Sequence, residues 1–290
     1  MPQTADVLVI GAGMAGASAA AHLSETAKVI LLEGEDQPGY HSTGRSAALF
    51  SETYGPLPVR ILTRAGRGFY EERAGGLAAH PILTPRGVLV YAMPGQEVLL
   101  DAAWAELSPL DPTIRRLDAE ETLSLVPVLR PDKVVAAIHE PGAMDIDVHG
   151  LHAAYLRLLR RRGGRLVSGA QVVSLDYAGG AWTATTTEGD FTAPVVVNAA
   201  GAWADAVAAL AGLPPVGLVP KRRTALIVAP PPDVDIRTCP LTIDAAETGY
   251  FKPEAGKLLV SPASSRRIVG SSGDSSAHAA SSSPSCLGIA

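Results

Sequence analysis

One local pattern near the N-terminus constrains the fold of this chain more than any other feature. A short β-branched run, Asp6–Ile10, leads directly into the glycine-rich segment Gly11–Gly16, which reads GAGMAG. An alanine-rich stretch over Ala17–Leu23 follows, and then a second apolar run, Lys28–Leu32, which ends at Glu33. This order predicts a parallel βαβ unit that binds a dinucleotide, because such units consist of a strand, a glycine-rich turn, a helix and a second strand followed by an acid.

Each part of this pattern has a physical role in such a unit. Gly11 permits the tight turn, Gly13 lets the backbone approach a pyrophosphate, and Gly16 lets the helix pack closely on the strand. The N-terminus of the helix offers N–H groups and a partial positive charge to phosphates. Glu33 can accept hydrogen bonds from the adenosine ribose hydroxyls, which disfavours a 2′-phosphate and therefore NADP. The alternative, an ordinary βαβ turn rich in glycine, does not require the aligned acid.

The stretch after Glu33 favours FAD over NAD. The segment Gln37–Ala48 combines a loop signal with small polar residues and one arginine, Arg45. FAD is a long, extended cofactor whose second phosphate and ribitol lie beyond the first helix, and Arg45 with the neighbouring hydroxyls can supply contacts there. The alternative is a solvated loop that opens a short helix over residues 46–50.

A segment far along the chain supports the same cofactor. The residues Ala193–Trp203 predict a buried strand that ends in a turn of small residues, and a helix is expected from about Ala204 to Ala211. Small residues at the turn let the backbone come close to the adenosine half of a cofactor. Plain sheet packing explains this segment when it is taken alone, but together with the N-terminal pattern it favours FAD.

Composition excludes several other classes of protein. The chain has 290 residues, of which 47% are hydrophobic, so it can bury one large domain or two intertwined ones. A net charge of −5 argues against a nucleic-acid binder. Two cysteines, Cys239 and Cys286, are too few for a disulfide framework, which predicts a cytoplasmic location. The apolar stretch Val195–Pro220 is interrupted by Asn198 and Asp205, so we expect no stable membrane insertion.

Several motifs, in their order and spacing, resemble the glycine/D-amino-acid oxidase (DAO) family of FAD-dependent oxidoreductases. The motifs are GAGMAG, GYHSTGRSAA, VVNAAGAW, PKRRT and GYFKP, and the last two are most similar to the D-arginine-oxidising branch of that family. The similarity runs from about Asp6 to Ala263. It implies an α/β fold in which a Rossmann-like FAD-binding domain is interleaved with an α+β substrate domain built on an antiparallel sheet.

Carried over position by position, the resemblance implies two sets of site residues. On the substrate side, Arg223 would clamp a carboxylate through parallel charge-assisted bonds, while Tyr54 and Tyr250 would position the substrate with their hydroxyls. The alternatives are a strand-edge charge for Arg223 and ordinary half-buried tyrosines. The positions implied to contact FAD are Gly11, Gly13, Ala15, Gly16, Glu33, Gly34, Ser42, Thr43, Gly44, Arg45, Ser46, Ala47, Ala48, Leu49, Val172, Ala200 and Gly201.

The implied function is oxidation of the CH–NH2 group of a small-molecule D-amino acid to a 2-oxo acid, through an imine and with hydride transfer to flavin N5. Two departures make the pocket less polar than in the D-arginine-oxidising branch. Val88 stands where that branch has a glutamate for the guanidinium, and Leu49 stands where it has a histidine beside the flavin. The alternatives are a glycine- or sarcosine-type amine oxidase on the same fold, or an inactive truncated flavoprotein fragment. The electron acceptor is not implied.

Two predicted helices have clear N-terminal signals. Asp118 is expected to cap a helix over Ala119–Val126, and Asp147 is expected to cap a helix from Val148 to about Arg162. The latter helix carries His149 and His152, which we interpret as ordinary helix surface, and no metal site is predicted.

The expected domain organisation is discontinuous. Residues 1–55 and 145–220 are predicted to form the FAD-binding domain, and residues 56–144 and 221–263 the substrate domain. From Ser264 the chain is rich in serine and lacks a hydrophobic period, so residues 264–290 are expected to be a disordered tail. The resemblance implies that family members continue here with a second arginine and a glycine-rich loop over the flavin ring. We therefore expect the chain as written to lack half of that site and to bind FAD weakly.

Overall fold

The computed structural model describes residues 2–78, 80–262 and 265–267. It divides into two units, each drawn from separate stretches of the chain. Unit 1 comprises residues 1–48, 66–83 and 146–219, and unit 2 comprises residues 49–65, 84–145 and 220–290. Residues 49–55, which we predicted in the FAD-binding domain, group with unit 2, and residues 66–83, which we predicted in the substrate domain, group with unit 1.

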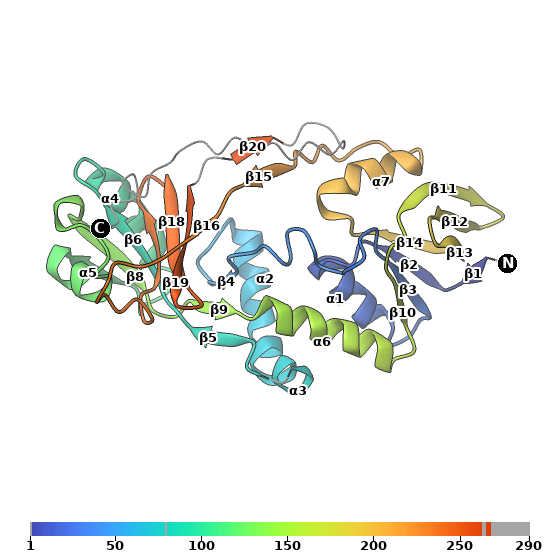
Figure 1. The fold of residues 1–290 in the computed structure, drawn as a ribbon, viewed down its shortest axis with the longest axis horizontal. Helices are drawn as coiled ribbons and strands as arrows, with labels where there is room; N and C mark the ends of the chain where they lie inside the picture. Colours follow the sequence, from blue (N-terminus) through green and yellow to red (C-terminus); the bar gives the residue numbers. More distant parts are fainter. Residues whose placement is uncertain (1, 79, 263–264, 268–290) are drawn as a thin grey trace. The chain divides into compact units, whose positions relative to one another are not determined.

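Unit 1 is built on a parallel four-stranded sheet with the strand order β10–β3–β2–β14 (Figure 1). The two central strands are buried along their whole length, which explains why their sequences are continuous apolar runs. Helix α1 (Met14–Leu23) connects β2 to β3, so the predicted βαβ unit is confirmed. The four strands are β2 (Val7–Ile10), β3 (Val29–Leu32), β10 (Arg165–Val167) and β14 (Val195–Asn198).

A second, mainly antiparallel sheet completes unit 1, in the order β1–β13–β12–β11. Phe191 is fully buried in one cluster with Leu8 of the parallel sheet and Leu175 of this sheet, so both sheets share a hydrophobic core. The strands are β1 (Gln3–Thr4), β11 (Val172–Ala178), β12 (Ala181–Thr186) and β13 (Gly189–Ala193).

Helix α6 (Val148–Arg161) packs beside α1 in unit 1 (Figure 1). Asp147 caps it, since an oxygen of the Asp147 side chain accepts from the Gly150 N–H at 2.8 Å, as predicted. The other helical segments of this unit are η1 (Phe69–Arg73), α3 (Ala74–Leu77), η3 (Gly201–Trp203) and α7 (Ala204–Leu210). No helix among the described residues is long and apolar enough to cross a membrane.

Unit 2 is built on a seven-stranded sheet with the order β16–β19–β18–β17–β6–β8–β7. Its pairs are antiparallel, as predicted, except that β6 and β17 run parallel. The strands are β6 (Val88–Ala92), β7 (Arg115–Asp118), β8 (Ala136–Glu140), β16 (Leu226–Val228), β17 (Leu241–Asp244), β18 (Gly249–Glu254) and β19 (Lys257–Pro262).

Alternation along these strands gives the sheet two differently covered faces. Leu89, Tyr91 and Phe251 belong to a buried cluster against which residues of α5 pack. Ile138 belongs to a separate cluster with Leu100 of α4. The helices and the remaining strands are α2 (Leu57–Gly68), α4 (Glu97–Leu107), α5 (Ala119–Leu125), η2 (Pro131–Lys133), and a small sheet of β4 (Leu49–Phe50), β9 (Met144–Ile146) and β5 (Leu83–Pro85).

One part of the predicted disordered tail forms a strand. Residues Ser265–Arg267 are β20, which pairs antiparallel with β15 (Lys221–Arg223). The prediction of disorder is therefore wrong for these residues, because backbone hydrogen bonds to a neighbouring strand do not require apolar side chains. The rest of the segment after residue 267 lies outside the described residues.

The helix α5 offers a test of the fold at one residue. Asp118 and Glu121 form a reciprocal capping box, in which the Asp118 side chain accepts from the Glu121 N–H at 2.9 Å. We expect Asp118→Ala to lower the free energy of unfolding by about 1 kcal/mol, measured by urea denaturation. Asp118→Asn keeps an acceptor oxygen and should lose much less. Equal losses in the two variants would contradict the cap.

Candidate functional site

The glycine-rich turn of unit 1 is pressed against the end of β14. Gly11 has a φ of +98°, and a Cβ there would lie 2.6 Å from the carbonyl oxygen of Ala199. A Cβ at Gly16 would lie 1.8 Å from the carbonyl oxygen of Gly11. These neighbours are backbone atoms that cannot move aside, so the close approach of strand, turn and helix requires glycine at both positions.

Gly13 differs from Gly11 and Gly16 because neither its backbone angles nor a nearby backbone atom requires glycine at this position. Its φ of −73° and ψ of −171° suit any residue. A Cβ there would meet only the Thr43 hydroxyl, at 3.2 Å. The lack of a side chain at Gly13, at the start of α1, is what a pyrophosphate needs to approach the helix N-terminus. The turn therefore fits a dinucleotide cofactor.

The end of β3 brings the predicted adenosine contacts together. The carboxylate of Glu33 accepts from the Ala12 N–H at 2.7 Å and from the Glu35 N–H at 3.0 Å, which holds it beside the turn. The Glu33 carbonyl accepts from the Ala170 N–H at 2.7 Å. A Cβ at Gly34 would lie 3.8 Å from Gln171, so Glu33 and Gly34 lie next to the segment that begins β11 at Val172.

The loop after β3 lies against the start of α1. Thr43 accepts from the Met14 N–H at 3.0 Å, and the Gly44 N–H donates to the Gly39 carbonyl at 2.7 Å. The guanidinium of Arg45 is exposed and lies 4.7 Å from the centre of the Tyr40 ring. The alternative of a helix over residues 46–50 is not formed, because residues 46–48 are irregular and β4 follows.

The turn after β14 contacts the same loop. The rings of His41 and Trp203 lie 4.5 Å apart, and His41 Nε2 lies 2.7 Å from Oε1 of Glu35. Ala200 lies beside Gly11, since its Cα would be 2.9 Å from a Cβ there. The predicted cofactor segments of unit 1 thus meet at the carboxyl ends of parallel strands, where ligands bind in such sheets.

The remaining predicted cofactor positions are less enclosed. Ala15 is exposed on the first turn of α1 and Gly201 is exposed in η3, while Ser42, Gly44 and Ser46 are exposed in the loop. Ala47 and Ala48 are half-buried at the end of that loop. Leu49 belongs to β4 of unit 2, so the structure does not group it with the others.

One residue of this site escaped the sequence analysis. His149 is exposed, as predicted for a helix surface, but His152 is buried and its Nε2 lies 2.8 Å from the Ala12 carbonyl oxygen. The interpretation of His152 as surface is therefore wrong. Helical spacing places it on one face with Tyr155 and Leu159, which are both buried, and that spacing was the available signal.

In unit 2, Tyr250 and Arg223 belong to neighbouring parts of the structure. Tyr250 is half-buried on β18 and pairs with Ser261 on β19, and the Ser261 hydroxyl donates to the carbonyl of Thr224, the residue after Arg223, at 2.9 Å. On its other side Tyr250 pairs with Ile243 on β17. Successive cross-strand partners on β6 and β8, Val90 and Ile138, continue a row of side chains across the sheet. The phenol therefore lies at the end of an aliphatic row.

Tyr54 belongs to the segment of unit 2 that follows β4. The side chain of Tyr54 is exposed, and the residues just before Tyr54 are hydrogen-bonded to the buried acid Glu140. The carboxylate of Glu140 accepts from the Ser51 hydroxyl at 3.0 Å and from the Thr53 hydroxyl at 2.7 Å. Burial raises the pKa of the Glu140 carboxyl, and these two hydrogen bonds oppose the rise. Glu140 is also the cross-strand partner of Val88, so an acid does lie beside this position.

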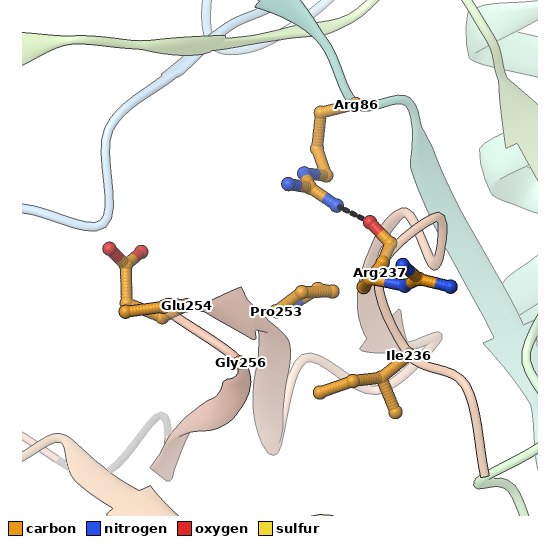
Figure 2. Close-up of a pocket in the computed structure, with 7 residues that line it drawn as sticks. Arg86, Ile236, Arg237, Pro253, Glu254 and Gly256 are labelled. Carbon is orange, nitrogen blue, oxygen red and sulfur yellow. Dashed lines mark hydrogen bonds between the residues drawn. The ribbon is translucent and has the colours of Figure 1, made fainter.

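A small cavity in unit 2 lies apart from these residues. It has a volume of about 180 Å³, and Arg86, Arg237 and Glu254 are among the residues that line it (Figure 2). The Arg86 guanidinium donates to the Arg237 and Cys239 carbonyls, at 3.0 Å each, and to Asp145 at 2.6 Å. Arg86 is thus engaged in holding the chain together, and none of the predicted site residues lines this cavity.

A family model described as FAD-dependent oxidoreductase, DAO, matches residues 6–283 of the chain. The chain belongs to the DAO family. Its cofactor is accordingly FAD, as predicted. The match continues beyond Ala263, so our prediction that the similarity ends there is wrong. The serine-rich composition of this segment concealed the relationship.

Similar proteins act on several amines. Rat mitochondrial dimethylglycine dehydrogenase is 27% identical over 268 residues, which cover 89% of this chain and 31% of that protein. Monomeric sarcosine oxidase from a Bacillus species is 25% identical over 204 residues, which cover 68% of this chain and 51% of that protein. The chain thus spans about a third to a half of the length of these relatives.

A solved structure agrees with this assignment. Iminodiacetate oxidase from Chelativorans sp. BNC1 is 29% identical with a TM-score of 0.70, and the match covers 91% of this chain and 72% of that one. The family match and these relatives together identify the chain as a member of the FAD-dependent oxidoreductases of the DAO family. These similarities do not show the predicted closeness to the D-arginine-oxidising branch.

The glycines of the turn give a prediction that separates folding from cofactor binding. We expect Gly13→Ala to change the free energy of unfolding by less than about 1 kcal/mol, because its backbone angles are ordinary. It should nevertheless weaken FAD binding at least roughly tenfold by filling the space above the turn. Gly11→Ala should instead lower the free energy of unfolding by more than about 2 kcal/mol.

Denaturant unfolding of the apoproteins and titration with FAD measure the two effects. Gly13→Ala protein with normal FAD affinity would contradict the location of the pyrophosphate.

Proposed function

We propose that this DAO protein oxidises the CH–NH2 group of a D-amino acid to a 2-oxo acid, through an imine that water hydrolyses. Bound FAD supplies the two-electron acceptor for this chemistry. The observation that carries the proposal is the arrangement in unit 2, where the carbonyl of Thr224, the residue after Arg223, accepts a hydrogen bond from Ser261, the cross-strand partner of Tyr250. A guanidinium, a phenol and the half-buried Ile243 and Val90 that follow it in the row together suit a carboxylate, an amine and an apolar side chain.

In this proposal Arg223 binds the substrate carboxylate. A guanidinium offers parallel donors that match a carboxylate, and Arg223 is exposed on β15. The hydroxyls of Tyr250 and Tyr54 orient the substrate as donors or acceptors. Orientation of the reacting bond is the main contribution that these side chains make to the rate.

The environment of Val88 supports an apolar substrate side chain. The half-buried Ile243 and Val90 continue the row from Tyr250, whereas Ile138 is packed against α4, and Val88 offers no charge. The acid beside Val88 is Glu140, which is buried and already accepts two hydroxyl hydrogen bonds. Glu140 is therefore poorly suited to pair with a substrate guanidinium.

A second candidate substrate is an N-substituted glycine. The names of the relatives above include dimethylglycine, sarcosine and iminodiacetate, each of which has its nitrogen next to a CH2 group and a carboxylate. The same arginine can bind this carboxylate. The two candidates differ in what contacts Ile243 and Val90, since glycine derivatives have no side chain on the α-carbon.

Anaerobic reduction of the bound flavin by a panel of substrates tests the proposal. We expect D-methionine and D-phenylalanine to bleach the flavin with higher specificity constants than D-arginine. The lack of a charge-assisted bond costs roughly 1.5–3 kcal/mol, which corresponds to about 10- to 150-fold. A higher constant for sarcosine than for any D-amino acid would favour the second candidate. A preference for D-arginine would show that Glu140 or another acid replaces the missing one.

The role of Arg223 can be tested against its neighbour. Successive side chains of a strand point to opposite faces, so Arg222 is a matched control for charge on β15. We expect Arg223→Met to raise KM roughly 10- to 100-fold through the loss of charge-assisted hydrogen bonds, with normal flavin content. Arg222→Met should leave KM unchanged. Equal effects of both variants would indicate only a general electrostatic role.

A further inference from the structure

The buried histidine of α6 contacts the middle of the glycine-rich turn. His152 is 6% exposed, and its Nε2 lies 2.8 Å from the carbonyl oxygen of Ala12. A carbonyl oxygen can only accept a hydrogen bond, so Nε2 carries the proton and donates it. The N–H of the same residue, Ala12, donates to Glu33 at 2.7 Å. Both backbone polar groups of Ala12 are thus held by side chains from other elements.

A second contact between α6 and α1 fixes the position of His152 along α1. Asp147 caps the start of α6 through the Gly150 N–H, and Arg162 at its end donates to the Ala21 carbonyl of α1 at 2.7 Å. The Arg162 guanidinium also pairs with Glu25 at 3.1 Å. Since His152 lies near the start of α1 and Arg162 near its end, the two helices run in the same direction.

We propose that His152 is a positioning residue for the cofactor pyrophosphate, an inference that depends on FAD binding at the turn. The Ala12 carbonyl and the Gly13 N–H belong to one planar trans peptide and point in opposite directions. A donor that holds the carbonyl therefore sets the direction of the Gly13 N–H. Among the described residues, no hydrogen bond engages this N–H, so it is available to an anionic ligand.

The physical consequence of losing this donor is local. A buried carbonyl without a partner is costly, so the peptide would rotate towards another donor or water. Rotation would carry the Gly13 N–H away from the direction in which it meets a phosphate. Thr43, which accepts from the Met14 N–H, and Glu33 would still hold the ends of the turn. The fold should therefore survive while phosphate binding weakens.

Substitutions in α6 with three ligands test this role. His152→Leu removes the donor but keeps an apolar side chain, and we expect it to weaken the binding of FAD and of ADP about tenfold. Adenosine, which has no phosphate, should bind as it does to the wild-type protein. His152→Gln restores a donor and should bind FAD within about threefold of wild type. His149→Leu changes an exposed histidine on the same helix and should have no effect.

The complete apoprotein is titrated with FAD by fluorescence and with ADP and adenosine by calorimetry, and thermal unfolding of each variant reports the fold. An equal loss of ADP and adenosine affinity would overturn the proposal, as would a loss that His152→Gln does not recover. Normal FAD and ADP binding by His152→Leu would also overturn it. Wild-type protein that binds neither FAD nor ADP would instead overturn the FAD site itself.

Discussion

Unit 1 depends on how closely two stretches of backbone approach each other at the carboxyl end of its parallel sheet. Gly11 turns in contact with Ala199, and α1 then starts directly against the carbonyl of Gly11. This approach brings the ends of β2 and β14 together, so the segments that follow them share one edge of the sheet. A side chain at Gly11 or Gly16 would separate the strands, and the N–H groups of α1 would no longer lie at that edge.

Unit 2 depends on buried charge. One oxygen of Asp145 accepts from Arg86 at 2.6 Å, and the other accepts from Lys252 at 2.9 Å. Removing three charges from water is costly, and the cost is offset because each carboxylate oxygen has its own cation. Arg86 also donates to the carbonyls of Arg237 and Cys239, so this cluster connects the approaches to β6 and β17 with β9 and β18. The strand that carries Tyr250 is therefore held by ion pairs.

The features that could be predicted from the sequence are those that depend on near neighbours. The caps at Asp118 and Asp147 each involve residues three positions away, and the glycine-rich turn lies between its own strand and helix. Features that depend on contacts between residues far apart in the sequence could not be predicted from local patterns. Helical spacing shows which face His152 shares, but not that this face meets the turn. Likewise, composition gives no sign that residues 265–267 pair with β15.

The parallel pairing of β6 with β17 has a consequence for the order in which the chain folds. These strands lie at the centre of one sheet, yet the whole stretch from residue 146 to residue 219, which belongs to the other unit, separates them in the sequence. During synthesis β6, β7 and β8 emerge first and can form antiparallel pairs at once. The edge of β6 then stays unpaired until β17 is made, and an unpaired central edge is a template for pairing between chains. Aggregation of the nascent protein is therefore favoured during this interval.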